Sequence, residues 1–290
     1  MSNSTNATTN ATTKATKVWF ITGASSGFGR ALAEETIGRG ERVVVTARSV
    51  DTLRELVARA PERVLALHLD VTKPDQIHAA LKAATARFGD VDVVVNNAGF
   101  SMVGALEETS DDELRAAMDT MFFGAVTLTR AVLPRMRERK TGTVVQITSV
   151  GGLITAPGFG PYCAAKHALE AVSEALAAEV APFGIRVLIV EPGAFRTSLF
   201  GPAFRTMPAM EAYAPTVGPT RAFASQSHGA QDGDPVKAAR AIVDAVVAGA
   251  PTLRLPLGAD AVANIRAKLA SVGADVNASE AVATSTAVGR

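Results

Sequence analysis

The sequence contains one cysteine, Cys163, among its 290 residues. A single thiol can form neither an internal disulfide nor a cysteine-rich metal site, which fits a reducing compartment. No set of histidine, cysteine and carboxylate residues has the spacing of metal ligands, so we predict a protein that works without a metal. We therefore expect a cytoplasmic location and no disulfide framework.

The sequence also lacks an excess of charge of either sign, with 29 Lys and Arg against 28 Asp and Glu. No long basic run is present, which argues against nucleic-acid binding and against a polybasic membrane anchor. No apolar run approaches the roughly 18 residues that a membrane span needs. Residues 1–16 have neither the basic start nor the apolar core of a signal peptide. We expect no nucleic-acid partner and no membrane partner.

What the sequence has is a large share of hydrophobic residues, 48%, which is enough for a sizeable core. The first sixteen residues are almost wholly Ser, Thr, Asn and Ala, a composition typical of a disordered tail. Residues 273–290 are again small and polar, and we expect a flexible tail there. Residues 17–272 contain no repeat and no linker, so we predict a single domain.

Short apolar runs alternate with longer helical patterns along this domain. The strand candidates are 18–22, 42–47, 64–69, 91–96, 143–148, 186–190 and, more weakly, 252–256. Helical patterns cover 27–39, 51–59, 73–88, 110–138 and 160–183. Several strand candidates are nearly continuous in Val, Ile and Leu, as in parallel strands that are covered on both faces. The alternation predicts an α/β fold, a doubly wound (Rossmann) parallel sheet of about seven strands with helices on both faces.

Residues 195–235 interrupt this alternation, because they contain no clear strand pattern. A loop of this length in a compact domain is usually a functional lid or disordered. Its apolar and aromatic residues, among them Phe200, Phe204 and Met207, favour a lid-like segment over a linker.

A glycine-rich turn lies between the first predicted strand and the first predicted helix. It comprises Gly23, Ala24, Ser25, Ser26, Gly27, Phe28 and Gly29. Glycines permit a tight turn and close backbone approach, and a helix N-terminus offers free N–H groups to an anion. Such a turn can be purely structural, but its place after the first strand favours binding of a dinucleotide pyrophosphate.

Arg48 follows the second predicted strand, where an acidic residue would select NAD by binding the ribose 2′-hydroxyl. An arginine is instead placed to meet a 2′-phosphate, which favours NADP(H) over NAD(H). The alternative is a solvated arginine at the start of a loop.

Tyr162 and Lys166 are four residues apart in a helical pattern and share one face of that helix. A nearby positive charge favours phenolate, so we expect Lys166 to lower the tyrosine pKa from about 10. The spacing alone is weak evidence, because surface pairs of this kind are common.

In combination these motifs resemble the short-chain dehydrogenase/reductase family, in its single-domain branch, from about Lys17 to Leu269. The motifs that carry the resemblance are Thr22-Gly23-x3-Gly27-x-Gly29, Asn96-Asn97-Ala98-Gly99, Ser149, Tyr162-x3-Lys166 and Pro192-Gly193-x3-Thr197. Their order along the chain is the order found in that family.

The resemblance implies a catalytic role for Ser149, Tyr162 and Lys166. Tyr162 would be the general acid in carbonyl reduction and the base in alcohol oxidation. Lys166 would lower its pKa and hydrogen-bond the nicotinamide ribose. Ser149 would hold the substrate oxygen and stabilise the developing alkoxide.

The resemblance also implies a set of cofactor-binding residues beyond the glycine turn and Arg48. Asp70 and Val71 would lie beside the adenine. Asn97, Ala98 and Gly99 would border the adenine ribose. The nicotinamide carboxamide would be held by Pro192, Gly193, Phe195 and Thr197. The family usually pairs the two long helices into dimers and tetramers, so a homodimer or homotetramer is expected.

Met121 departs from the family, which usually has an asparagine there that helps to hold a water in the proton relay. A thioether is a weak acceptor. Either backbone carbonyls hold the water or proton resupply is slowed, and Met121 can also simply pack.

The expected substrate is an apolar ketone, aldehyde or secondary alcohol, because the segments expected to frame the pocket contain few charges. The side chains expected there are Met102, Leu153, Ile154, Phe159, Phe200, Phe204 and Met207. Two alternatives remain open. One is an NADP-binding regulator with reduced turnover, and the other is an NAD-retaining epimerase or dehydratase.

Overall fold

The computed structural model describes residues 16–201, 204–249 and 252–288. The tail expected over residues 1–16 therefore lies outside the described residues, except for Thr16.

Seven parallel strands form the central sheet, in the order β3-β2-β1-β4-β6-β7-β9. They are β1 (Val18–Ile21), β2 (Arg42–Ala47), β3 (Val64–His68), β4 (Val93–Asn96), β6 (Gly142–Ile147), β7 (Ile185–Pro192) and β9 (Arg254–Leu257). A separate pair joins β5 (Met102–Val103) to β8 (Arg205–Thr206). The prediction of a doubly wound sheet of about seven strands is confirmed.

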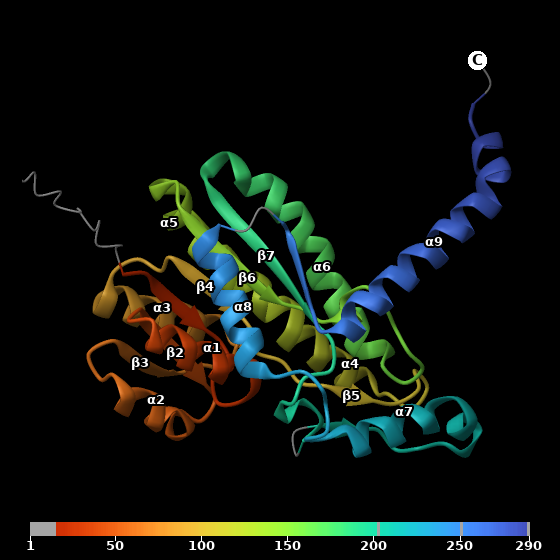
Figure 1. The fold of residues 1–290 in the computed structure, drawn as a ribbon, viewed down its shortest axis with the longest axis horizontal. Helices are drawn as coiled ribbons and strands as arrows, with labels where there is room; N and C mark the ends of the chain where they lie inside the picture. The colour runs from red at the N-terminus through yellow and green to blue at the C-terminus, as the bar shows by residue number, and fades with distance from the viewer. Residues whose placement is uncertain (1–15, 202–203, 250–251, 289–290) are drawn as a thin grey trace, which may run out of the picture.

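Helices cover both faces of the sheet (Figure 1). The α-helices of the described residues are α1 (Gly27–Gly38), α2 (Arg54–Arg59), α3 (Pro74–Phe88), α4 (Asp111–Met118), α5 (Gly124–Arg139), α6 (Gly160–Val180), α7 (Ala214–Ser227), α8 (Pro235–Ala248) and α9 (Ala259–Ser285), of which α1, α2 and α8 cover one face of the sheet and α3, α5 and α6 the other. A π-helical turn, η2 (Asp119–Phe123), connects α4 to α5. Short 3-10 turns are η1 (Val50–Leu53), η3 (Val150–Gly152), η4 (Ala181–Phe183), η5 (Ser198–Phe200) and η6 (Glu211–Tyr213).

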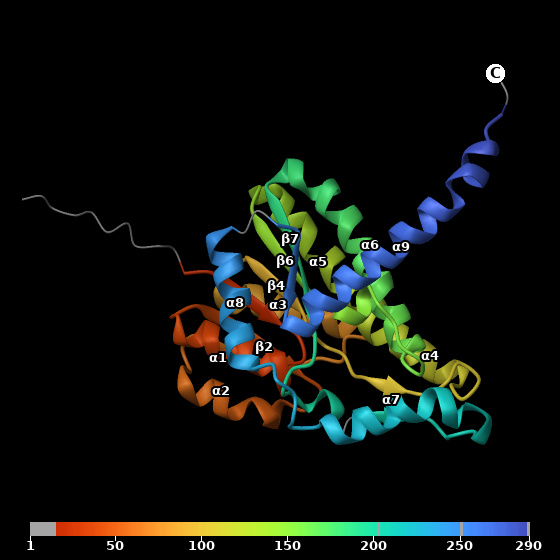
Figure 2. The same ribbon diagram turned by 45° about the vertical axis from the view of Figure 1, so that its right-hand side comes forward.

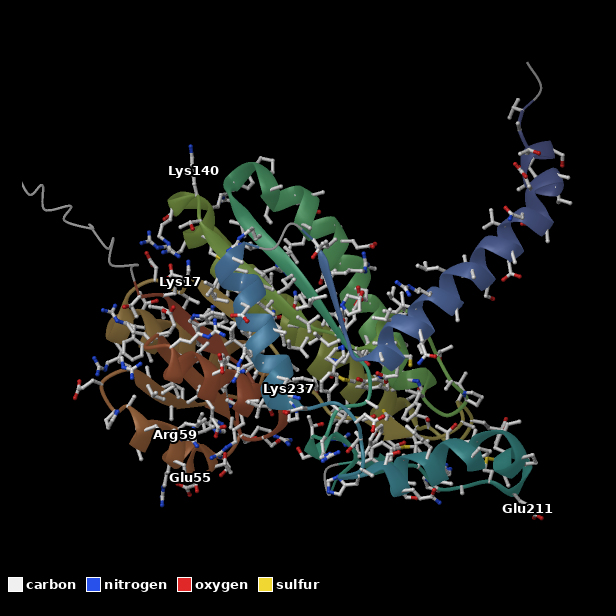
Figure 3. The ribbon with its side chains drawn as sticks, viewed as in Figure 1. Lys17, Glu55, Arg59, Lys140, Glu211 and Lys237 are labelled. Atoms are coloured by element: carbon white, nitrogen blue, oxygen red, sulfur yellow. The ribbon has the colours of Figure 1, made fainter. Side chains whose placement is uncertain are left out.

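Alternation along the strands produces two hydrophobic cores. Trp19 and Ile21 of β1 face one way and pack with α1, α2 and α8. Val18 and Phe20 face the other way and pack with α3, α5 and α6. Successive side chains of a strand point to opposite faces, so a four-residue strand contributes to both cores. Charged side chains such as Lys140 and Glu211 point away from this body (Figure 3).

The run from Asp111 to Arg139 spans 29 residues and is apolar enough to meet the length and composition criteria of a membrane span. Leu128, Val132 and Met136 on this run are buried in the second core. The run therefore has the position of a core helix that covers the sheet.

Three helices were not expected from the sequence. Helix α7 lies within the segment 195–235, and α8 packs on α1 to complete one face of the sheet. Residues 273–285, where a flexible tail was predicted, form the second half of α9. Their small polar residues obscured the helical pattern, but the chain forms one continuous helix that projects from the body (Figure 2).

Candidate active site

A cleft of about 540 Å³ runs along the carboxyl ends of the strands. The strand order reverses between β1 and β4, and the crevice at such a switch point is where open α/β sheets bind ligands. The predicted residues that line this cleft are Gly23, Ser25, Ser26, Gly27, Phe28, Arg48, Asp70, Val71, Asn97, Ala98, Gly99, Ser149, Tyr162, Lys166, Pro192, Gly193, Phe195 and Thr197. The fold thus gathers onto one cleft residues that are up to about 170 positions apart in the sequence.

Gly29 was also predicted to bind the cofactor, but it does not line the cleft. A Cβ at Gly29 would lie 2.4 Å from the Gly23 carbonyl oxygen and 2.4 Å from the Asn97 amide nitrogen. Gly23 and Gly27 have positive φ angles of 66° and 56°, which favour glycine. These constraints explain why the turn contains three glycines.

Asn97 fastens the glycine turn to the end of β4. Its side-chain amide donates to the carbonyls of Thr22 (2.8 Å) and Gly23 (3.1 Å). The Thr22 hydroxyl accepts from the backbone N–H groups of Asn97 (2.9 Å) and Ala98 (3.0 Å). No side chain caps the first turn of α1, so its N–H groups face the cleft and suit a phosphate. The residues present therefore fit the pyrophosphate of a dinucleotide.

The loop after β7 meets the glycine turn across the cleft. The rings of Phe28 and Phe195 are 5.1 Å apart, and the Ser198 hydroxyl donates to the Ser26 hydroxyl at 3.0 Å. These contacts bring together the phosphate and nicotinamide ends that the sequence predicted separately.

Arg48 and Asp70 lie at the end of the cleft beyond β2 and β3. Arg48 is exposed and lines the cleft, and its charge acts on Asp70. Burial opposes ionisation of Asp70, but hydrogen bonds from the backbone and hydroxyl of Thr72 outweigh it and hold its pKa below the usual value. An ionised Asp70 is thus fixed beside a guanidinium that is free to meet a further anion.

The three residues assigned to catalysis converge where the cleft meets its aromatic end. A Cβ placed on Gly151 would lie 3.2 Å from the Tyr162 ring and 3.3 Å from the Ser149 hydroxyl. The Ser149 hydroxyl accepts from the Gly151 N–H at 3.0 Å, which leaves its own proton to donate. The Lys166 ammonium lies 5.9 Å from the centre of the Tyr162 ring and donates to the Ile147 carbonyl at 2.9 Å.

The expectation that Lys166 lowers the pKa of Tyr162 is wrong for this structure. Burial raises the pKa of Tyr162 to about 12, the Cys163 thiol adds to the rise, and the Ser149 hydroxyl opposes it. Burial also lowers the pKa of Lys166 to about 8, against the charge of Glu170. Burial therefore decides the pKa of the phenol, and Tyr162 keeps its proton at neutral pH.

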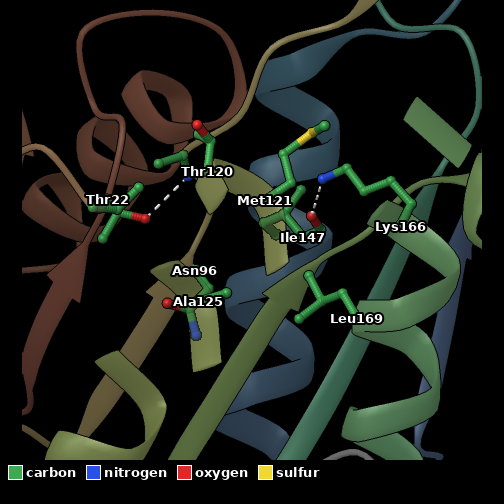
Figure 4. A pocket seen from close by; sticks show the side chains of 10 residues that line it. Thr22, Asn96, Thr120, Met121, Ala125, Ile147, Lys166 and Leu169 are labelled. Carbon is green, nitrogen blue, oxygen red and sulfur yellow. Dashed lines mark hydrogen bonds between the residues drawn. The ribbon is translucent and has the colours of Figure 1, made fainter. Parts of the chain in front are cut away.

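Met121 lies in the π-helical turn and is 1% exposed. It lines the cleft and also a small adjoining cavity of about 10 Å³, together with Lys166, Asn96 and Thr22 (Figure 4). A cavity of this size is just large enough for one water molecule. The thioether therefore borders the space beside the Lys166 ammonium where the asparagine of the family was expected.

The substrate end of the cleft is aromatic. Phe200 is the centre of this wall, with ring distances of 6.3 Å to Phe159, 5.4 Å to Phe204 and 6.0 Å to Phe223. Ile154, Phe159 and Phe200 line the cleft as predicted. Four of the predicted side chains do not line it: Met102 and Met207 are buried in the core, Phe204 packs against Phe200, and Leu153 lies outside the lining. Phe100 and Arg205 stack at its edge, 3.9 Å apart.

Several residues that shape the site were missed from the sequence. The Asp260 carboxylate at the start of α9 accepts from the Ala194 N–H at 2.7 Å and holds the loop after Pro192. Asn264 on α9 and Phe223 on α7 also line the cleft. Both helices were absent from the predicted pattern, so no local signal connected these residues with the site.

A buried ion cluster lies behind the same loop. Glu191, which directly precedes Pro192, is wholly buried and lies 2.8 Å from the Arg254 guanidinium. Glu170 and Glu174 pair with the same guanidinium. Burial raises the pKa of Glu191 to about 7, with the charge of Glu170 adding to the rise and Arg254 opposing it. This arginine joins β9 to β7 and α6 beneath the nicotinamide loop.

Across residues 16–201, 204–249 and 252–288, no group of three or more His, Cys, Asp or Glu side chains is arranged to hold a metal ion. Independence from metals stays a prediction.

Residues 17–208 match the family model described as short chain dehydrogenase. The chain is 40% identical over 248 residues to the oxidoreductase BOA17 of Botryotinia fuckeliana, covering 85% of this chain and 90% of that protein. A short-chain dehydrogenase from Streptomyces avermitilis is similar in structure, with a TM-score of 0.89 and 50% identity over 94% of this chain and all of that one. The 3-ketoacyl-(acyl-carrier-protein) reductase of Brucella melitensis, solved with NADH, has a TM-score of 0.70 and 27% identity over 83% of this chain and 96% of its own.

Proposed function

Because this chain belongs to the short-chain dehydrogenase family of oxidoreductases, we propose that it interconverts an apolar ketone or aldehyde and the corresponding alcohol, using NADP(H). A bound nicotinamide cofactor supplies the hydride in reduction and accepts it in oxidation. The observation that carries the proposal is the position of Tyr162 and Ser149, between a dinucleotide-shaped cleft and an aromatic pocket.

Tyr162 is the general acid for carbonyl reduction in this proposal. Its pKa of about 12 keeps the phenol protonated at neutral pH, so that a proton is present to donate to the substrate oxygen. The Ser149 hydroxyl accepts from the Gly151 N–H and keeps its own proton to donate to the same oxygen. The Lys166 ammonium supplies positive charge beneath the site and, through the cavity beside Met121, a path by which a proton is replaced.

The preference for NADP(H) rests on Arg48. It lines the cleft at the end of β2, the position where an acidic residue would bind a free ribose 2′-hydroxyl. An arginine binds a phosphate through charge-assisted hydrogen bonds, which a ribose hydroxyl cannot match.

The apolar substrate is supported by the rings around Phe200. Phe159, Phe200 and Phe223 line the pocket next to Tyr162, and aromatic faces favour flat apolar groups. Arg205 is the cation at the rim, and its guanidinium stacks on Phe100 rather than pointing at Tyr162 as a charge for the substrate. An aromatic or steroid-like carbonyl compound suits this end better than a sugar phosphate.

The remaining parts of the proposal concern the molecule's surroundings. We propose that residues 195–235, with α7, act as a lid on the pocket, and that the protein is cytoplasmic. We propose a homodimer or homotetramer through the long helices α4–α5 and α6, with no membrane or nucleic-acid partner and no metal.

Oxidation of NADPH, followed by absorbance over a panel of carbonyl compounds, tests this function. Aryl ketones and apolar aldehydes should be reduced, whereas free sugars should not. If NADPH binds but no member of the panel is reduced, and no secondary alcohol is oxidised with NADP, the protein is a cofactor-binding regulator instead. Exchange at a sugar carbon without net change in the cofactor would favour an epimerase.

A further inference from the structure

Helix α9 is longer than the surface on which it packs. Its first turns contact β9 and η3, and Ala261 is the one buried residue among its 27. From Arg266 to the end of the helix every residue is exposed, and the helix extends away from the body (Figures 1 and 2). At 1.5 Å per residue the exposed part is about 30 Å long.

A regular apolar stripe begins on the packed turns of α9, where Val262 and Ile265 are half-buried, and continues onto the exposed part. Val262, Ile265, Leu269, Val272 and Val276 follow one another at alternating steps of three and four residues, the spacing of a coiled-coil seam. Leu269, Val272 and Val276 are 64%, 42% and 59% exposed. A seam of this kind buries its side chains against a second helix.

The exposed part is a weak helix without a partner. Gly273 lies within it, and three valines, three serines and Asn277, all of lower helix propensity than alanine, stand beside its six alanines. Isolated helices of this length are marginal in water, and most helical stability in proteins comes from packing. The stripe therefore indicates a partner helix.

The charges on α9 identify that partner as a second copy in antiparallel orientation. Lys268 and Asp275 lie on the same edge of the stripe, seven residues apart, in the positions where coiled coils place pairing charges. Seven residues separate them by about 10 Å along one helix, too far to pair with each other. A two-fold axis between Ala270 and Ser271 brings Lys268 diagonally, along the edge of the stripe, to Asp275 of the second copy. The symmetry makes this pair twice.

The same axis aligns the apolar stripe. It sets Leu269 against Val272 of the second copy and Ile265 against its Val276, again twice. Parallel pairing would instead set Asp275 beside Glu280 of the second copy, where like charges repel. We propose that α9 forms an antiparallel coiled coil with α9 of a second copy of this chain, with Lys268 and Asp275 as its specifying ion pairs.

Charge exchange tests the proposal in the full-length protein. Lys268→Glu and Asp275→Lys should each raise the dissociation constant of one assembly step at least about tenfold, because each creates two repulsive pairs. The double variant Lys268→Glu/Asp275→Lys should return the constant to within about threefold of the wild-type value. Light scattering over a dilution series measures the assembly, whatever other interfaces the protein uses.

Arg266→Glu is the matched control, because the same alignment places residue 266 against Gly273 of the second copy. It should leave the constant within about threefold of wild type. NADPH binding and circular dichroism confirm that each variant is folded, and none of these residues lines the cleft.

A cysteine pair supplies an independent readout. Lys268→Cys/Asp275→Cys should form a covalent dimer under mild oxidation, whereas each single cysteine should not. The native Cys163 is buried and should not contribute. Covalent dimers from the single variants would bring equal positions of the two copies together, which the antiparallel alignment does not do, and would overturn the proposal. Equal assembly of all charge variants, with no cross-linking of the cysteine pair, would show that the stripe is covered by something other than a second copy.

Discussion

The half of the cleft proposed to hold the dinucleotide depends on the backbone geometry of a glycine turn, whereas the half proposed for the substrate is lined by aromatic side chains from separate segments. On the dinucleotide side, Gly23 and Gly27 are fixed by positive φ angles, and Gly23 and Gly29 by contacts closer than a Cβ allows. On the substrate side, Phe159, Phe200 and Phe223 come from α6 and its approach, from η5 and from α7. The first half can be changed at few positions without loss of the fold. The second half can be altered one ring at a time, and specificity should reside there.

Tyr162→Phe should have the largest effect, because Tyr162 belongs to the chemistry that both halves serve. Turnover should fall about a thousandfold, as loss of a general acid typically does, with NADPH affinity unchanged. The sequence offers a matched control in its other tyrosine, Tyr213, whose hydroxyl pairs with Glu107 away from the cleft. Steady-state rates and NADPH fluorescence distinguish the two variants. Comparable activity of Tyr162→Phe and Tyr213→Phe would contradict the assignment.

The second effect concerns pH. Lys166 has a pKa lowered to about 8, so its charge is present below that pH and lost above it. The rate of carbonyl reduction at limiting NADPH should therefore be constant below pH 8 and fall up to about tenfold per pH unit above it. In Lys166→Arg the side chain stays charged at high pH. The fall in rate above pH 8 should therefore disappear, whatever the absolute rate of the variant. A wild-type profile that stays flat to pH 10 would remove Lys166 from this role.

Arg48→Ala should affect the dinucleotide half alone. The ratio of kcat/KM for NADPH to that for NADH should fall about tenfold, because a charge-assisted contact to the 2′-phosphate is lost. Arg54→Ala is the control, since Arg54 pairs with Asp51 on the exposed surface outside the cleft. An unchanged ratio in Arg48→Ala would show that this arginine is solvated and does not contact the 2′-phosphate.

Phe200→Ala should affect the substrate half alone. Removing the central ring of the aromatic wall should raise KM for an aryl ketone about fivefold, with NADPH affinity unchanged. Phe183→Ala, at an exposed ring beyond the C-terminal end of α6, should change neither constant. A fall in NADPH affinity with no change in KM for the ketone would show that the two halves are not separate.

Met121→Asn should have the smallest effect. Met121 lines the cleft and the cavity beside Lys166 and is not part of the glycine turn proposed to hold the phosphates, so cofactor affinity should stay the same. A side-chain amide holds a water better than a thioether, and turnover should be maintained or rise by up to about threefold. A large fall in turnover with folding intact would contradict the relay argument.

The same contrast explains what could be predicted from the sequence. The strands, the glycine turn and the Tyr162–Lys166 spacing are local patterns, and the structure brings them together in one cleft. Asp260, Asn264 and Phe223 reach the site from helices whose small or mixed residues gave no clear period. The pKa of Tyr162 depends on burial, which spacing along a helix does not report. Local motifs therefore predicted the residues proposed for the chemistry, whereas the burial of those residues and the contributions of distant helices came only from the structure.

The transfer of deuterium from NADPH labelled at nicotinamide C4 tests the central claim most directly. With an aryl ketone in ordinary water, the alcohol product should carry one deuterium on its carbinol carbon when the transferable hydrogen is the labelled one. Mass spectrometry of that product, for both C4 epimers of the label, measures it. An alcohol that gains no deuterium from either epimer, or a label that stays on the cofactor while a sugar changes configuration, would contradict a direct reductase at Tyr162.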